Sequence, residues 1–282
     1  MADKALETVF LNGEFLPKDE AKVSAFDRGF VFGDGIYEVV PVINSKMVDK
    51  DGFWARFERS LNEIDISLPY EKEKFEAILN EIISKNALKE GGIYMQVTRG
   101  VAFRNLYFRR AVALYESEIL NNPAAKTGIK VVSVEDIRWK RRDIKSISLL
   151  AQCYAKNEAH KKGADEGFMV ENGFVTEATS SSAFIIKDNV LITKPLSNEI
   201  LPGIRRKVIL GFAEKAGLEI RQRPFTMQDV YEADEVFISA ATLPLLPVVK
   251  ADGKPINGGK VGKYVPMLRQ MYIDRIKKEA GL

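Results

Sequence analysis

The stretch that decides the fold is VEDIRWKRRDIKSISLL, residues 134–150. Five basic residues fall between Arg138 and Lys145, and the chain turns mostly apolar from Ile147 onward. A basic run of this kind is usually a solvated surface patch. Lys145 either closes this patch as an ordinary surface lysine or, at the mouth of the apolar segment, loses solvation, which favours the neutral amine. A neutral lysine can attack a carbonyl and form a Schiff base.

Length and composition indicate a globular protein with one large domain or two of ordinary size. The chain has 282 residues, of which 46% are hydrophobic and 29% are charged, and its net charge is +3. So mild a charge does not favour a nucleic-acid binder, and no apolar run approaches the length of a membrane span. MADKALETVF, the start of the chain, contains no signal-peptide core, so we expect a cytoplasmic protein. The single Cys153 excludes an internal disulfide.

The chain has one histidine, His160, which excludes metal sites built on two or three histidines. Its surroundings, NEAHKKGA, are typical of the solvated end of a helix. We therefore expect no metal, and chemistry that depends on lysine, tyrosine, carboxylates or a cofactor. Neither of the common glycine-rich nucleotide fingerprints is present.

The apolar pattern predicts a mixed α/β (α+β) fold rich in hairpins. Hairpin turns are expected at Asn172-Gly173, at Asp188-Asn189 and within VVKADGKPI. Helices are expected over 71–88, roughly 146–162, 203–218 and about 261–278. We expect a small N-terminal domain over 1–118, a linker over 119–128, and a large domain over 129–282, which the family resemblance described below implies is the cofactor-binding domain.

Other stretches carry residues suited to a phosphorylated ring, although each also has an ordinary structural explanation. VTEATSSSAF places Glu177 at the end of a strand, where a carboxylate can pair with a cationic ring nitrogen. ILPGIRRKVIL leads from a glycine turn into a helix whose free N–H groups at 203–205 form an anion site. FDRGFVFGDGIYEVV presents Tyr37 on a strand, and RFERSL carries Arg56 on a helix, where it reaches a phosphate or remains solvated.

Together and in this order, these motifs resemble the fold-type IV pyridoxal-phosphate aminotransferases of class IV, most closely the D-amino-acid aminotransferases. The resemblance extends over nearly the whole chain, and its most specific parts are DRGFVFGDGIYEV, VEDIRWKRRDIKS, VTEATSSS and ILPGIRR. It implies two domains, the larger with a barrel-like sheet, and a pyridoxal 5′-phosphate cofactor. It also implies a homodimer with active sites at the interfaces between subunits and domains.

The resemblance assigns roles to individual residues. Lys145 would hold the cofactor as an aldimine and carry the proton between the Cα of the amino acid and the cofactor. Glu177 would keep the pyridine nitrogen protonated. The other cofactor contacts implied are Arg56, Ile204 and Arg205 at the phosphate, Ser180 and Leu201 at the ring, and Ala241. The substrate contacts implied are Tyr37, Arg104 and Thr242. The arginines that precede Lys145 would stay on the wet side of the strand or contact neighbours.

The chain departs from the family pattern at substrate and phosphate contacts. Leu106 stands where the D-specific enzymes have a histidine, and Arg205 stands where a threonine is usual. Ala240 and Ala241 replace the usual hydroxyl residues. The guanidinium of Arg205 can compensate as a phosphate partner or point into solvent. These changes leave the chemistry in place and the substrate range open.

The function predicted is a transaminase that exchanges amino groups between a D-amino acid and a 2-oxo acid, such as 2-oxoglutarate or pyruvate, by a ping-pong route. Alternatives within the fold are an (R)-amine transaminase, a branched-chain amino acid aminotransferase and an aminodeoxychorismate lyase. Outside this class, the presence of both Lys145 and Glu177 argues against an inactive vitamer-binding module. The near-neutral charge, with Asp143 inside the basic run, argues against a nucleic-acid binder.

Overall fold

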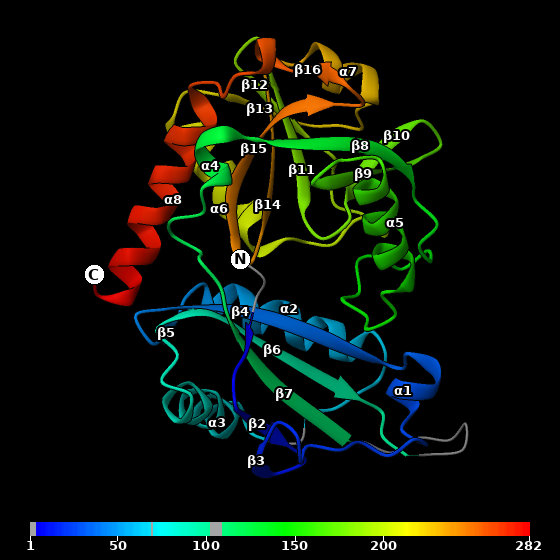
Figure 1. The fold of residues 1–282 in the computed structure, drawn as a ribbon, viewed down its shortest axis with the longest axis vertical. Helices are drawn as coiled ribbons and strands as arrows, with labels where there is room; N and C mark the ends of the chain where they lie inside the picture. The colour runs from blue at the N-terminus through cyan, green and yellow to red at the C-terminus, as the bar shows by residue number, and fades with distance from the viewer. Residues whose placement is uncertain (1–3, 69, 102–108) are drawn as a thin grey trace. The chain divides into compact units, whose positions relative to one another are not determined.

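The computed structural model describes residues 4–68, 70–101 and 109–282. Two compact units account for the chain, each with its own sheet (Figure 1). Unit 1 comprises Met1–Ile119, Ile144–Ser148 and Ile276–Leu282, and unit 2 comprises Leu120–Asp143 and Leu149–Arg275. The domain limits expected from the sequence stay a prediction. The expected linker, 119–128, contains the short helix α4 (Ala124–Thr127).

Unit 1 is built on a seven-stranded sheet with the order β3-β2-β7-β6-β4-β5, in which β1 also pairs with β7. The strands are β1 (Lys4–Ala5), β2 (Thr8–Leu11), β3 (Glu14–Pro17), β4 (Gly35–Ile43), β5 (Lys46–Met47), β6 (Glu90–Thr98) and β7 (Arg109–Glu116). Antiparallel pairing joins β4 to β6 along their whole length, from Gly35↔Thr98 to Ile43↔Glu90. This long pairing makes β4 a rigid support for the residues on it.

An aromatic core fixes the helices of unit 1, which are α1 (Arg28–Phe32), α2 (Lys50–Asn62) and α3 (Lys72–Lys85). Phe53, Trp54 and Phe57 of α2 pack with Phe75 of α3, with ring centroids 5.0–6.0 Å apart. These rings are almost fully buried, and α2 packs against β4. The packing therefore sets which face of α2 is turned to the strand.

Unit 2 contains a nine-stranded sheet with the order β10-β9-β8-β15-β14-β11-β12-β13, in which β16 pairs with β15. The strands are β8 (Ile129–Glu135), β9 (Glu166–Glu171), β10 (Phe174–Ala178), β11 (Ser182–Lys187), β12 (Val190–Thr193), β13 (Glu219–Gln222), β14 (Glu235–Ala240), β15 (Leu243–Ala251) and β16 (Lys254–Pro255). The sheet curls around an apolar core (Figure 1). The predicted mixed fold with a barrel-like sheet is confirmed.

The remaining helices are α5 (Leu150–Lys161), α6 (Ile204–Lys215), α7 (Met227–Glu232) and α8 (Tyr264–Ala280), with a 3₁₀ turn at Asn257–Gly259. Within unit 2, α5 packs on β8 and β9, and α6 on β13 and β14. The helix expected from about 146 begins only at Leu150. The reason is that Ser146 forms a β-bridge with Ile36 of β4, which holds the preceding segment in an extended conformation.

The hairpin turns predicted from the sequence are confirmed. Asn172 and Gly173, between β9 and β10, have φ angles of 51° and 81°, and Phe174 pairs with Glu171 across the turn. The turns at 188–189 and 252–253 have positive φ at both positions as well. No helix in the described part of the chain combines the length and the apolar character needed to cross a membrane.

Candidate active site

Lys145 is held in unit 1 by backbone hydrogen bonds between residues 144–148 and β4. The Tyr37 N–H donates to the Lys145 carbonyl oxygen at 2.9 Å, and the Ile147 N–H donates to the Gly35 carbonyl oxygen at 3.2 Å. Glycine at position 35 permits this approach, because a Cβ there would lie 3.1 Å from Ile147 Cδ1 and 2.5 Å from the Val97 carbonyl oxygen of β6. The close pairing of the two segments places Lys145 beside Tyr37 on the strand.

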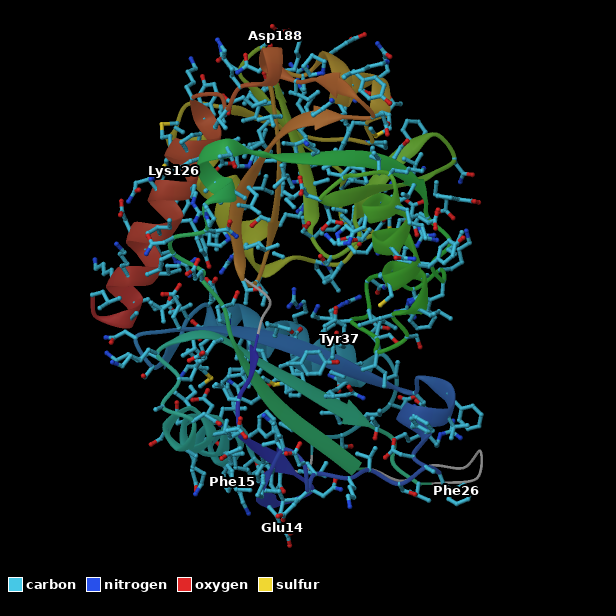
Figure 2. All side chains as sticks on the ribbon, in the orientation of Figure 1. Glu14, Phe15, Phe26, Tyr37, Lys126 and Asp188 are labelled. Carbon is cyan, nitrogen blue, oxygen red and sulfur yellow. The ribbon has the colours of Figure 1, made fainter. Side chains whose placement is uncertain are left out.

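The Lys145 side chain is half-buried, and its Nζ lies 3.8 Å from the centroid of the Tyr37 ring. Tyr37 stacks in turn on Tyr94 of β6, with centroids 5.4 Å apart, and the Tyr94 hydroxyl donates to Gln96 Oε1 at 3.1 Å. Burial, followed by the neighbouring Tyr37, raises the pKa of Tyr94 to about 12. Tyr94 is therefore a neutral hydrogen-bond donor at physiological pH. Two predicted site residues, Lys145 and Tyr37, are in direct contact. Figure 2 labels Tyr37 on its strand.

Arg56 projects from α2 into a buried ion pair with Glu38, the next residue after Tyr37 on β4. Arg56 Nε and Nη2 each lie 2.6 Å from a carboxylate oxygen of Glu38. Arg56 is 8% exposed and Glu38 is fully buried. One turn further along α2, the Ser60 hydroxyl accepts the Lys145 N–H at 3.5 Å. Arg56 is thus held rigidly on the element that also contacts the Lys145 backbone. Glu38 is not among the predicted site residues.

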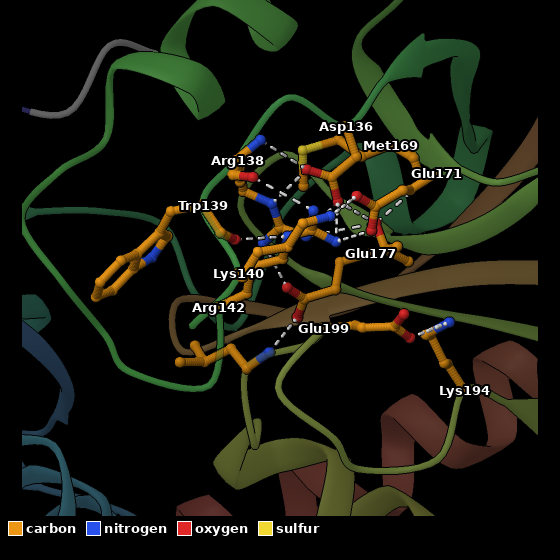
Figure 3. Close-up of polar contacts among 12 residues, drawn as sticks. Asp136, Arg138, Trp139, Lys140, Arg142, Met169, Glu171, Glu177, Lys194 and Glu199 are labelled. Atoms are coloured by element: carbon orange, nitrogen blue, oxygen red, sulfur yellow. Dashed lines mark hydrogen bonds and ion pairs between the residues drawn. The ribbon is translucent and has the colours of Figure 1, made fainter. Parts of the chain in front are cut away.

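Glu177 lies near the end of β10 in unit 2 and is buried. Its Oε2 accepts a hydrogen bond from Arg138 Nη1 at 2.7 Å (Figure 3). Its Oε1 accepts one from the Leu201 N–H at 3.0 Å. Burial raises the pKa of Glu177, and the charge of Arg138 opposes this, with a net shift upward. Two predicted site residues, Glu177 and Leu201, are therefore joined by a direct hydrogen bond.

The arginines of the opening motif are not all at the surface. Arg142 is nearly fully buried, and its Nη1 lies 2.7 Å from Glu171 Oε2 and 3.3 Å from Asp136 Oδ2 (Figure 3). The hydrogen bonds from Arg142 and Lys140 lower the pKa of Glu171 to about 2. The expectation that these arginines stay on the solvent-exposed side of the strand is therefore wrong for Arg138 and Arg142. Both contact neighbouring residues, because each neutralises a buried carboxylate.

The start of α6 combines features that favour an anion. Gly203 is the N-cap and makes no side-chain cap hydrogen bond, and a Cβ there would lie 2.8 Å from Ser182 Oγ. The N–H groups of the first turn carry the positive end of the helix dipole. The nearby Ser181 Oγ is buried without a hydrogen-bond partner among the described residues. Backbone and hydroxyl donors are thus available for an oxyanion at Ile204.

Arg205 is buried, so the alternative that it points into solvent is wrong. Its Nε donates to the Tyr272 hydroxyl at 2.7 Å, and its Nη1 donates to the Ala240 carbonyl oxygen at 2.5 Å. The guanidinium also lies 4.5 Å from the centroid of the Tyr272 ring. Burial and then the charge of Arg205 lower the pKa of Arg269 to about 10. The guanidinium of Arg205 is thus packed between α8 and the end of β14.

The remaining predicted residues are placed as follows. Ser180 is exposed, with its Oγ 3.4 Å from Oε2 of the buried Glu166. Ala241 and Thr242 form the turn between β14 and β15. Arg104 lies outside the described residues. His160 is exposed near the end of α5, as the sequence indicated.

Unit 1 therefore contains Lys145, Tyr37 and Arg56, and unit 2 contains Glu177, Ser180, Leu201, Ile204, Arg205, Ala241 and Thr242. A family model described as amino-transferase class IV matches residues 35–251, which include all of these positions. The chain belongs to the class IV aminotransferase family. The predicted enzyme class is thereby confirmed.

Curated relatives of this aminotransferase match it over nearly its full length. The D-alanine aminotransferase of Staphylococcus aureus (strain N315) is 43% identical over 273 residues, which cover 94% of this chain and 95% of the relative. The D-alanine aminotransferase of Listeria monocytogenes serotype 4b is 37% identical over 281 residues, or 97% of each chain. The resemblance to D-amino-acid aminotransferases is confirmed by these matches.

Solved structures share the fold at lower identity. A T.th. branched-chain amino acid aminotransferase, complexed with N-(5′-phosphopyridoxyl)-L-glutamate, has a TM-score of 0.89 at 23% identity and covers 97% of this chain and 95% of its own. The branched-chain enzyme of Escherichia coli has a TM-score of 0.85 at 22% identity, covering 95% and 93% of the two chains. Identities this low show the fold, which is that of this family of aminotransferases. The roles of individual residues stay predictions.

Removing the carboxylate of Glu38 should strongly destabilise the aminotransferase. Glu38→Leu leaves the buried charge of Arg56 without its bidentate partner, and such a loss typically costs about 3–5 kcal/mol. We expect the free energy of unfolding, measured in urea by tryptophan fluorescence, to fall by that order. The matched control is the double variant Glu38→Leu with Arg56→Met, which removes both charges and should recover most of the loss. A single variant as stable as the wild type would show that the Arg56 charge is not costly to bury without Glu38.

Glu171 should make the free energy of unfolding fall as the pH is lowered into the acid range. Its carboxylate has a pKa of about 2 in the folded chain against an ordinary value of 4.5. The ionised form therefore stabilises the fold above the ordinary value, and that contribution is lost as the pH falls toward 2. In urea unfolding at pH 5, 4 and 3, the stability difference between wild type and Glu171→Gln should shrink with each step. A constant difference across this range would contradict the assignment.

Proposed function

We propose that this chain is a pyridoxal 5′-phosphate-dependent transaminase that exchanges an amino group between a D-amino acid and a 2-oxo acid, either 2-oxoglutarate or pyruvate. The observation that carries the proposal is its 37–43% identity to D-alanine aminotransferases along almost the whole chain. The neighbours solved with N-(5′-phosphopyridoxyl)-L-glutamate and with pyridoxamine 5′-phosphate support the cofactor.

The donor set of the described residues fits this cofactor. A buried carboxylate, Glu177, is suited to a ring nitrogen that carries a proton. The first turn of α6, with the buried Ser181 hydroxyl near it, is suited to a phosphate. The half-buried amine of Lys145 is suited to the aldehyde. We assign Lys145 as the covalent attachment point, Ile204 and Arg205 to the phosphate through their amides, and Arg56 to the phosphate through its guanidinium.

Pyridoxal phosphate, when bound, would supply an electron sink that makes the Cα proton of the amino acid acidic. The Lys145 amine would take this proton and return it as a general acid. Tyr37 contacts the Lys145 Nζ through its ring, and this contact stabilises the charged amine when it holds the proton. Glu177 would keep the nitrogen of the ring protonated. Each of these tasks uses a side chain that the fold already holds in place.

Recognition of the substrate carboxylate is assigned to Arg104, together with Tyr37 and Thr242. The family histidine two residues after that arginine is Leu106 here. Loss of a charged hydrogen bond weakens carboxylate binding by about 1.5–3 kcal/mol. This replacement favours (R)-amines, which have no carboxylate, as a second substrate class. Branched-chain L-amino acids are the third class to test, because the structural neighbours are named branched-chain amino acid aminotransferases.

We also propose that the enzyme is a homodimer. Large apolar side chains are exposed on and before α1, and these are Val23, Phe26, Phe30, Val31 and Phe32. Phe26 and Phe30 are more than 70% exposed (Figure 2 labels Phe26). Several large apolar side chains exposed in one short segment are typical of a surface that another protein covers. A second copy of the chain is the proposed partner, and the cytoplasm stays the predicted location.

Half-reactions with three donors should establish the substrate class. D-alanine should discharge the bound cofactor of the wild-type enzyme, observed by its visible spectrum, faster than L-leucine or (R)-1-phenylethylamine. Lys145→Ala should lower the rate with D-alanine by about 10²–10⁴-fold, because it removes the general base.

The control for this variant is Lys162→Ala, an exposed lysine beyond α5, which should keep the wild-type rate. Borohydride treatment of the wild type should fix the cofactor to the peptide that contains Lys145. Discharge by L-leucine alone would contradict the D-specific proposal, and cofactor fixed to another lysine would contradict the assignment of Lys145.

A charge within the apolar stretch should break the dimer. Phe30→Asp places a carboxylate in the proposed interface, where burying it without a partner is costly. Light scattering after size exclusion should report a dimer for the wild type and a monomer for the variant. Leu196→Asp, at an exposed leucine of unit 2, is the matched control and should stay dimeric. A wild type that is monomeric at all concentrations tested would overturn the proposal.

A further inference from the structure

Burial by itself would favour the neutral, protonated form of Glu177. Its side chain is 8% exposed, and burial disfavours the carboxylate. Four groups act on it. Arg138 from the loop after β8 and the Leu201 N–H bind its two oxygens. The charges of Asp136, at the end of that loop nearest β8, and of Arg206, on α6, act on it at longer range. Only Arg138 makes a direct charged contact with it in the described part of the chain.

Arg138 cannot turn freely, because Asp136 holds the other side of its guanidinium. Nε lies 2.9 Å from Asp136 Oδ1 and Nη2 lies 2.8 Å from Oδ2. The Thr176 hydroxyl donates to Asp136 Oδ2 at 2.5 Å. With this fork fixed on Asp136, the remaining Nη1 of Arg138 is directed at Glu177 (Figure 3). The Arg138 side chain is 6% exposed, so little water screens its charge.

We infer that Arg138 is a positioning residue that keeps the Glu177 carboxylate ionised and fixed in orientation. The inference rests on the proposed function, in which Glu177 faces the ring nitrogen of the cofactor. A proton shared between that nitrogen and Glu177 has two places to reside. The Arg138 guanidinium, 2.7 Å from the carboxylate, lowers the affinity of Glu177 for the proton. The proton therefore stays on the ring nitrogen. Asp136 acts one step further away, by holding Arg138.

The competing explanation is that Arg138 only stabilises the fold. Arg142 is the matched residue for separating the two, since it is as deeply buried and binds Asp136 and Glu171. Within the described structure, these contacts of Arg142 do not include Glu177. Replacing Arg138 or Arg142 by methionine should therefore damage stability to a similar degree. Only the Arg138 variant should change the ionisation of Glu177.

The test is a pH titration of the apoprotein by NMR, with ¹³C at the carboxyl carbons of glutamate and with Glu177→Gln to assign the signal. In Arg138→Met, the Glu177 signal should titrate at a clearly higher pH than in the wild type. In Arg142→Met it should titrate as in the wild type. Arg138→Lys keeps the charge and should lie in between, which preserves the test if the methionine variant does not fold. Equal titration of Glu177 in all four proteins would overturn the inference.

Cofactor affinity gives a second measurement that does not depend on turnover. The wild type should bind pyridoxal phosphate more tightly than its analogue with C–H in place of the ring nitrogen, by about 10-fold or more for a charged hydrogen bond. This preference should fall several-fold in Arg138→Met and stay unchanged in Arg142→Met. A wild type that does not bind pyridoxal phosphate would contradict the proposed function. If Arg138→Met keeps the wild-type preference for pyridoxal phosphate over the analogue, only the role of Arg138 is contradicted.

Discussion

The backbone pairing between β4 and residues 144–148 is the constraint on which the site depends. It joins Tyr37 to Lys145 and Gly35 to Ile147, although these partners are more than a hundred positions apart in the sequence. Because of it, the segment that carries Lys145 is part of unit 1, while the chain on both sides belongs to unit 2. A lysine on a free loop would sample many positions, and ordering it for each reaction would cost conformational entropy. Here that entropy has already been lost in folding.

Buried charge pairs are the second constraint, and each supports a residue assigned to the cofactor. Arg56 is held by Glu38 in unit 1, and Glu177 is held by Arg138 in unit 2. A buried ion pair adds little net stability, because desolvating both charges costs about as much as their attraction returns. Such a pair does provide a fixed geometry. Side chains that are assigned to bind a cofactor need this geometry so that they can bind it without rearranging.

Local features of the structure can be predicted from the sequence, and contacts between distant residues cannot. The turns at 172–173 and 188–189 follow from residues that tolerate positive φ, and the helices 72–85 and 204–215 follow from apolar spacing. The ion pair of Arg138 with Glu177 joins residues 39 positions apart, and no periodicity marks it. Apolar spacing places the start of α5 too early, because the bridge from Ser146 to β4 is a tertiary contact. The family resemblance implies roles for Lys145 and Glu177, which stay predictions, but it does not identify the residues that hold these two side chains in place.

Arg205 illustrates how a substitution at a predicted phosphate site is accommodated. A guanidinium is much larger than the threonine usual at this position, and a buried charge without partners is costly. The structure places it over the Tyr272 ring and against the Ala240 carbonyl oxygen, so stacking and hydrogen bonds offset its desolvation. The backbone N–H groups at the start of α6 do not depend on this side chain. A helix start can therefore keep its affinity for an anion while the side chain beside it changes, because the dipole and the amides belong to the backbone.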